Sequence, residues 1–182
     1  MSGNPDDAGR WAECDVWVAP KGSTFPADPS EDPGEDFELI GYLDGSAGVV
    51  KSMDEDNDKL KAWGGAQIDA VNTFNGESFA FTAIEDNDVV WGVVYAGSDA
   101  PTTTTGLTTR VAKVPQRSEK AWLIRLSRSN GTKKDYQVPL GIARPSSDVT
   151  ENETNLGGTE ITVDVLSNSS DELHSELIKA AD

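Results

Sequence analysis

The 182-residue sequence contains a single cysteine, Cys14, and a single histidine, His174. One cysteine cannot form an intramolecular disulfide, so the chain is not a disulfide-stapled secreted scaffold. A zinc centre or a nucleophilic triad would depend on His174 alone, and no ligand or triad spacing accompanies it. We therefore expect no metal site, no bound cofactor and no catalytic residues, and we predict that the chain is not an enzyme.

Long apolar runs and excess basic charge are also missing. No stretch of about 18 apolar residues occurs, so we expect no membrane-spanning segment. The opening residues, MSGNPDDAGRW, have neither a basic patch nor an apolar run, and we expect no signal peptide. Lys and Arg number 15 against 32 Asp and Glu, which gives a formal net charge of −17. Such an acidic surface repels nucleic acid and argues against a module that reads DNA or RNA.

Alternating apolar residues predict a mainly β protein. Asn75-Gly76 and Asn130-Gly131 are typical of tight hairpin turns. A helix is predicted over 86–97 because Asp86 or Asn87 can cap it and valines recur at helical spacing. Valine lowers helix propensity, so a strand there is the alternative. The expected strands cover 14–20, 37–43, 66–74, 78–85, 120–129, 133–145 and 159–167, with an extended Thr-rich stretch at 101–115.

These elements predict one mainly antiparallel β domain of about seven or eight strands, residues 13–167, with one helix in the middle of the sequence. Residues 1–12 are expected to form a flexible arm, and 168–182 an arm or a short helix. Two long loops are expected, at 21–36 and 44–62. Loops longer than about 12–15 residues are usually functional or disordered. Long loops and arms are typical of a subunit that orders them against copies of itself.

The run DEDND places Asp54, Asp56 and Asp58 at alternating positions. An EF-hand needs glycine at position 6 and a bidentate glutamate at position 12 of its loop. Counted from Asp54, those positions hold Lys59 and Gly65. The pattern therefore favours a solvated acidic loop over a calcium site.

Trp63 precedes Gly64-Gly65 at the point where we expect the loop 44–62 to return to the β domain. Two interpretations stay open: a core residue at a backbone bend, or an intersubunit anchor, since Trp is enriched at interface hot spots. At the other end of the same loop, Asp44-Gly45 is typical of a turn.

Glu85 ends a predicted strand just before the helix cap at Asn87. A structural role in bonding backbone groups is favoured for Glu85 over general acid–base work. We expect the two residues to form a strand–helix junction.

Four stretches, in this order, resemble the major tail proteins, or tail tube proteins, of long, non-contractile-tailed bacteriophages. VWVAPKGSTFPADP is similar to the opening strand and Pro-rich loop of that family, and FELIGYLDGSAGV to its G-y-x-x-x-D-G segment. LKAWGGAQIDAVNTF resembles its i-x-a-W-G-G entry into a central strand. FAFTAIEDNDVVWGVVYAG resembles a strand, an E-x-N sequence and a short helix ending in y-x-G. Together they span residues 16–97.

The resemblance implies a fold, an antiparallel β-sandwich or small barrel with one flanking α-helix. It also implies a structural subunit of the virion tail, assembled in the host cytoplasm. Six copies would form a ring, and rings would stack into a tube through which DNA passes without specific binding. The other implied partners are the tape measure protein and the tail terminator and tip proteins. In that family the loop after the second strand typically reaches the neighbouring ring. Here this inter-ring loop would be 44–62, with Trp63-Gly64-Gly65 at its base.

Two other functions are compatible with the sequence. One is the inner tube of a contractile tail or secretion system, which shares the fold. The other is a calcium-dependent β-sandwich binding module, although such modules usually carry more complete calcium loops. An enzyme is the weakest interpretation because no constellation supports it.

Overall fold

The computed structural model describes residues 9–149 and 157–181. The arm predicted at 1–12 lies mostly outside these residues. The described elements are β1 (Glu13–Pro20), β2 (Glu38–Leu39), β3 (Val50–Lys61), β4 (Gln67–Ala83), α1 (Asp88–Val94), β5 (Thr102–Thr104), β6 (Leu107–Thr109), β7 (Lys120–Ser127), β8 (Lys133–Pro145), β9 (Thr159–Val165) and β10 (Ser175–Lys179).

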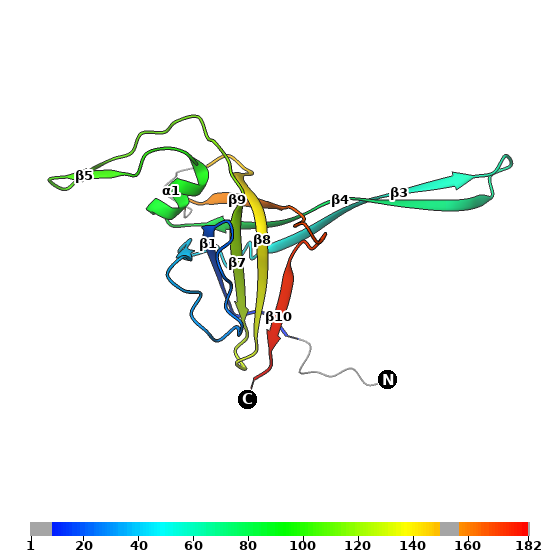
Figure 1. Ribbon diagram of the computed structural model, residues 1–182, viewed down its shortest axis with the longest axis horizontal. Helices are drawn as coiled ribbons and strands as arrows, with labels where there is room; N and C mark the ends of the chain where they lie inside the picture. Colours follow the sequence, from blue (N-terminus) through cyan, green and yellow to red (C-terminus); the bar gives the residue numbers. More distant parts are fainter. Residues whose placement is uncertain (1–8, 150–156, 182) are drawn as a thin grey trace.

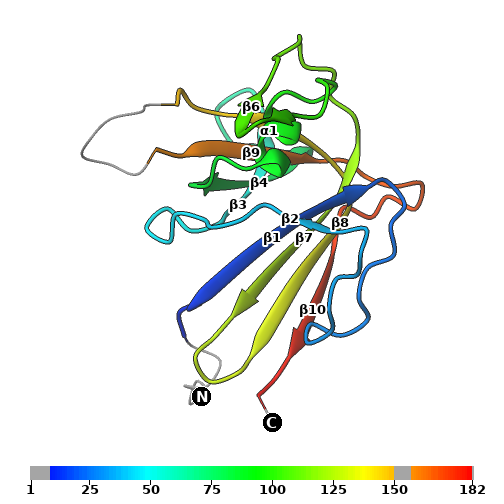
Figure 2. The ribbon, with the colours of Figure 1, turned by 90° about the vertical axis from the view of Figure 1, so that its left-hand side faces the viewer.

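Antiparallel pairing joins most of these strands into one continuous sheet in the order β2-β1-β7-β8-β9-β4-β3, and β10 also pairs with β8. The sheet folds over on itself, so that β1, β7, β8 and β10 form one layer and β9 and β4 lie across it (Figure 2). The predicted antiparallel, mainly β sandwich with one helix is confirmed. No helix in the described ranges has the length and apolarity needed to span a membrane.

The strand β8 turns the corner between the layers. Its first part, Lys133–Gln137, pairs with β10, and its last part, Gly141–Pro145, pairs with β9. Gly141 lies at the change of layer. A Cβ there would come 2.6 Å from Val163 Cγ1 and 2.9 Å from Trp122 Cδ1, closer than real Cβ contacts allow. The corner therefore needs glycine because two core side chains approach its backbone.

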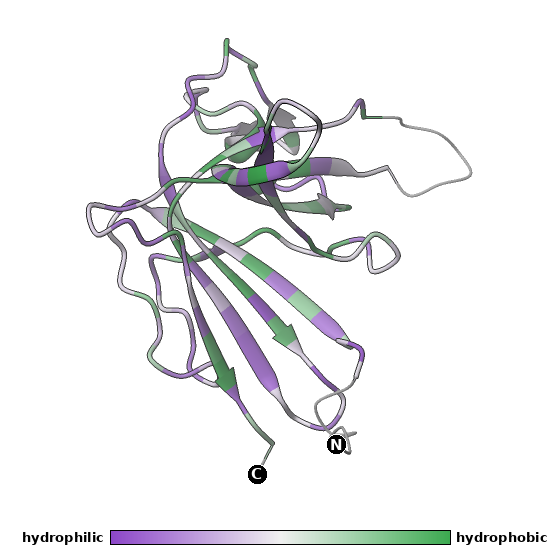
Figure 3. Ribbon diagram, turned by 90° about the vertical axis from the view of Figure 1, so that its right-hand side faces the viewer, coloured by the Kyte–Doolittle hydropathy of each residue, from purple (hydrophilic) through white to green (hydrophobic). Residues whose placement is uncertain are grey.

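Apolar residues from both layers and from α1 fill the space between them. Phe79 and Phe81 of β4, Trp122 of β7 and Ile161 of β9 are 0–2% exposed. Hydrophobic and hydrophilic residues alternate along the strands of the body (Figure 3). This is the period-two pattern of strands with one face in a core.

Residues 21–36 contain no helix or strand and cover the other face of the β1-β7-β8-β10 layer. Arg125 is held by Asp135 across the sheet, with Nε–Oδ1 2.8 Å and Nη2–Oδ2 2.7 Å, and its Nη1 donates to the Glu31 carbonyl at 2.8 Å. Gln137 Nε2 donates to the Pro26 carbonyl at 2.7 Å. These buried side chains replace the water that would otherwise solvate the loop backbone.

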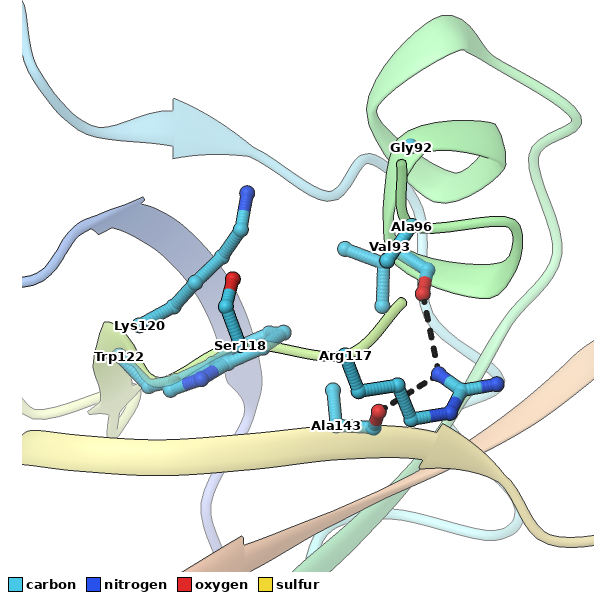
Figure 4. Close-up of a pocket in the computed structure, with 8 residues that line it drawn as sticks. All are labelled: Gly92, Val93, Ala96, Arg117, Ser118, Lys120, Trp122 and Ala143. Carbon is cyan, nitrogen blue, oxygen red and sulfur yellow. Dashed lines mark hydrogen bonds between the residues drawn. The ribbon is translucent and has the colours of Figure 1, made fainter. Parts of the chain in front are cut away.

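The predicted helix is confirmed as α1. Its last carbonyls are bound by Arg117, which donates to Val93 O at 3.3 Å and Val94 O at 3.2 Å. The same guanidinium donates to Ala143 O of β8 at 2.7 Å (Figure 4). A cation at the C-terminus of a helix is electrostatically favourable, and here it also fastens the helix to the sheet.

Four expectations about secondary structure are wrong. The strand expected at 37–43 is reduced to β2, with an isolated bridge between Leu43 and Ala83. Asn75-Gly76 is not a turn but lies inside β4, opposite Asp54. Residues 50–61 of the expected loop 44–62 form β3. The C-terminal segment is the strand β10 rather than a helix, because it pairs with β8.

We predict that Gly141→Ala lowers the free energy of unfolding by about 1–3 kcal/mol, because the added methyl overpacks the corner. Gly92→Ala is the matched control. It adds the same methyl to α1, where nothing lies within 4 Å, and should stabilise the protein by about 0.5–1 kcal/mol. Urea unfolding measures both, and equal effects of the two substitutions would contradict this account.

Candidate functional site

The most exposed feature is a hairpin, here called the arm, made of β3 and the first half of β4 (residues 50–75). It projects away from the body along the long axis of the molecule (Figure 1). Every residue of β3 is exposed, and so are residues 67–75 of β4. An isolated two-stranded hairpin is marginally stable in water. Its length therefore points to a partner that covers it.

The arm carries large apolar side chains that nothing in the described chain covers. Trp63 is fully exposed at 108% and Ile68 is 71% exposed, while Met53, Val71 and Phe74 range from 47% to 56%. A concentration of exposed apolar residues on one projection marks an interaction site in soluble proteins. The core interpretation of Trp63 is therefore wrong.

The tip of the arm is the turn between Lys61 and Gln67, so Trp63-Gly64-Gly65 lies at the tip and not at the base. Ala62 N donates to Ala66 O at 2.7 Å, and Gly65 N donates to Ala62 O at 3.0 Å. Gly64 and Gly65 have φ of 109° and 90°, a region that side chains disfavour. The two glycines make the turn, and Trp63 extends from it into solvent.

Asp54, Asp56 and Asp58 lie on β3, where alternate residues point to the same face. They form an acidic stripe on one face of the arm. Asp56 accepts a hydrogen bond from Asn75 Nδ2 at 3.0 Å. An extended strand cannot wrap its carboxylates around one ion as a calcium loop does. In residues 9–149 and 157–181, no cluster of three or more potential metal ligands is present.

Asp44 and Gly45 are separated from the tip by the whole of β3, about 40 Å at 3.3 Å per residue. Asp44 closes a turn at the body. Its Oδ1 accepts hydrogen bonds from Ser46 Oγ at 2.7 Å and Ser46 N at 2.8 Å, and these bonds lower the pKa of its carboxyl group. The residues predicted to form one inter-ring loop therefore lie apart: Asp44 and Gly45 at the body, and Trp63-Gly64-Gly65 at the tip of the arm.

A charged cluster around the buried carboxylate of Glu77 lies at the base of the arm. Glu77 of β4 is 4% exposed, and its Oε1 lies 2.7 Å from His174 Nδ1. Lys51 Nζ of β3 lies 3.0 Å from His174 Nε2 and 3.6 Å from Glu77 Oε2. Lys51 Nζ and His174 Nε2 lie within hydrogen-bond distance, whereas the contact between His174 and Glu77 has the distance of an ion pair without the geometry of a hydrogen bond. The cluster joins both strands of the arm to the segment that leads into β10.

The sequence did not predict this cluster, because His174 lies in the segment 168–182 that was expected to form an arm or a short helix. The ring packs edge-on against Phe79, with centroids 5.8 Å apart. One signal was available. Glu77 shares the inward parity of Phe79, Phe81 and Ala83, and a charge at an inward position needs a partner.

Glu85 and Asn87 lie in the connection between β4, which ends at Ala83, and α1, which Asn87 caps. Asn87 Oδ1 accepts from Val90 N at 2.9 Å, which caps α1, and Nδ2 donates to Ile40 O at 2.7 Å and to Glu85 Oε2 at 3.1 Å. Gly41 has φ of 103°, and a Cβ there would come 2.8 Å from Asn87 Nδ2. The segment at Ile40–Gly41 therefore packs against the segment at Glu85–Asn87, about 45 residues later in the sequence. This contact anchors the chain to the body shortly before β3 begins.

These features define a class: a β-sandwich subunit with an exposed apolar arm that is built to assemble. The family model for phage tail tube proteins matches residues 1–181. The chain therefore belongs to the phage tail tube protein family, and it is a structural subunit of the tube in the virion tail.

Two solved structures are distantly similar. One is the sheath–tube complex of an extracellular contractile injection system, PVC, in the extended state, at 12% identity over 92% of this chain and 88% of that chain, with a TM-score of 0.42. The other is the cap that terminates the tube of the anti-feeding prophage AFP, at 14% identity over 100% of both chains, with a TM-score of 0.39. No curated protein sequence matches the chain.

We predict that Asn87→Ala lowers the free energy of unfolding by about 2 kcal/mol, since it removes the helix cap and the bond to Ile40 O. Asn87→Ser is the matched control. Its hydroxyl can still cap α1 but is too short to reach Ile40, so its loss should be about half as large. Thermal and urea unfolding measure both effects. If serine were as damaging as alanine, the cap would contribute nothing.

Proposed function

We propose that this tail tube subunit forms hexameric rings that stack into the tube of a long, non-contractile tail, and that the arm joins one ring to the next. The observation that carries the proposal is the exposed arm with uncovered apolar residues. A partner that buries these residues removes apolar area from water at about 25 cal/mol per Å². Identical heterologous contacts generate closed rings or open stacks, and a tube needs both.

Sheet edges support contacts within a ring. In the described chain β10 pairs on one side only, with β8, and β3 is the edge strand at the end of the sheet. An open edge offers backbone N–H and C=O groups to a strand of another subunit. Pairing edge to edge around a ring would join the sheets of six copies.

The remaining roles follow from the resemblance and the charge. The tape measure protein and the tail terminator and tip proteins are the expected partners, with assembly in the host cytoplasm. With a net charge of −17, a tube of these subunits repels the DNA backbone, so a genome can slide through without binding. The role is structural, without catalysis.

The test shortens the arm without breaking its pairing. Residues 55–75 are replaced by Asn-Gly, which joins Asp54 to its partner Gly76 through a two-residue hairpin turn. Deleting 52–58 alone would be a poorer test, because it removes one strand and leaves the facing part of β4 unpaired. We expect the shortened protein to fold as a monomer, since the removed residues are exposed, and to form no tubes.

Negative-stain electron microscopy of concentrated protein measures tube formation, and circular dichroism and thermal unfolding measure the fold. The intact chain is the control and should form tubes or stacked rings. Normal tubes from the shortened protein would show that the arm does not join the rings.

A further inference from the structure

We propose that Trp63 at the arm tip of one copy inserts into a pocket beside α1 of the next copy. This inference rests on the proposed function and names the surface that receives the arm. The pocket has a volume of about 400 Å³ and lies between α1, the end of β4 and the start of β9. Volumes of about 300–1,000 Å³ are typical of sites that enclose drug-sized ligands, so an indole ring fits.

The pocket is built to receive an aromatic side chain. Its lining includes Trp91 and Tyr95, whose rings lie 4.3 Å apart, and Arg110, whose guanidinium lies 5.5 Å from the Trp91 ring. Aromatic and guanidinium surfaces both stack favourably on indole. Within the described residues, Trp91 Nε1 and Arg110 Nε are buried without an acceptor. Backbone carbonyls beside Trp63 are acceptors that the incoming tip would bring.

Charge at the two surfaces is complementary. The tip carries Lys59 and Lys61 and has no acid from Lys59 to Ala66, although the chain as a whole is strongly acidic. Asp86 lines the pocket and Asp88 pairs with the same Arg110 beside it; their side chains are 86% and 67% exposed. Glu85 also lines the pocket. Three carboxylates against one guanidinium leave the rim negative, opposite to the tip.

The position of the pocket requires a second copy. Trp63 lies just before the first residue of β4, and Ala83, the last residue of β4, lines the pocket. Seventeen strand residues separate the two ends by about 50 Å, so the tip cannot fold back into its own pocket. A knob at one end and its receptor at the other make a head-to-tail contact that repeats along a stack.

A second cavity of about 300 Å³ is a weaker receptor. It is lined by Phe25, Gln137, Pro139, Asn168, Glu172, His174 and Ser175. Its walls carry more amide, hydroxyl and ionisable groups than aromatic surface. An indole gains less there than against Trp91 and Tyr95.

Cross-linking of assembled protein tests the contact. The parent is Cys14→Ser, which removes the only native thiol; burial raises the pKa of that thiol to about 12, so it is unreactive in the folded protein. Ala66→Cys at the tip and Thr159→Cys in the pocket lining are added together. We expect mild oxidation of tubes to give a ladder of linked subunits on a non-reducing gel. The matched control pairs Ala66→Cys with Asn130→Cys in the β7–β8 turn and should give no ladder.

Tryptophan substitution gives an independent readout. Trp63→Ala should raise the critical concentration for tube formation about 30-fold, the loss typical of a hot-spot residue, while the melting temperature stays unchanged because the side chain is fully exposed. Trp63→Phe should recover part of the loss.

The outcomes separate the two proposals. Tubes without a ladder, or tubes from Trp63→Ala at the parental critical concentration, would overturn the Trp63 contact and leave the tube role standing. A parent that never forms tubes would overturn the proposed stacking of this chain, and the contact with it.

Discussion

The arrangement of this subunit depends on the burial of Phe79 and Phe81 in one half of β4. These rings fix which residues of the strand face the core, and a shift by one position would turn both into solvent. The other half of β4 continues from this anchor into the arm. The core therefore anchors the base of the arm, and an irregularity in the pairing, which leaves Asn75 as an extra residue of β4, shifts the register where the arm leaves the body. Glu77, held by Lys51 and His174, lies at the boundary between the two halves.

The body could be predicted from the sequence because its strands carry the apolar residues of the core. Apolar and polar residues alternate in β9, whereas β7 is buried on both faces from Ala121 to Leu126, and its apolar run still indicates a strand. The helix could be predicted because Asn87 is a favourable N-cap residue. The arm could not be found in this way. With both faces in solvent, β3 has no apolar alternation, and its charges are typical of a loop.

The position of Trp63 was misjudged for the same reason. When residues 50–61 are taken for a loop, Asn75-Gly76 is interpreted as the hairpin turn, and Trp63-Gly64-Gly65 is placed at the base of that loop. Asp54 pairs with Gly76 and Lys61 pairs with Gln67. The turn of the hairpin therefore lies at 62–66, and Asn75-Gly76 lies near its base, the opposite of the predicted arrangement. The clusters around Glu77 and Gly41 were also beyond sequence reasoning, because each joins segments distant in the chain.

The charges of β3 have a further consequence for the free subunit. A long, flat, exposed edge strand can pair with the same strand of another copy and seed fibrils. Two copies of β3 aligned edge to edge would bring the carboxylates of Asp54, Asp56 and Asp58 close to one another, and facing like charges weaken such a pair. The acidic stripe thus disfavours pairing between the β3 strands of free subunits. This repulsion helps the subunits to remain dispersed before they join a tail.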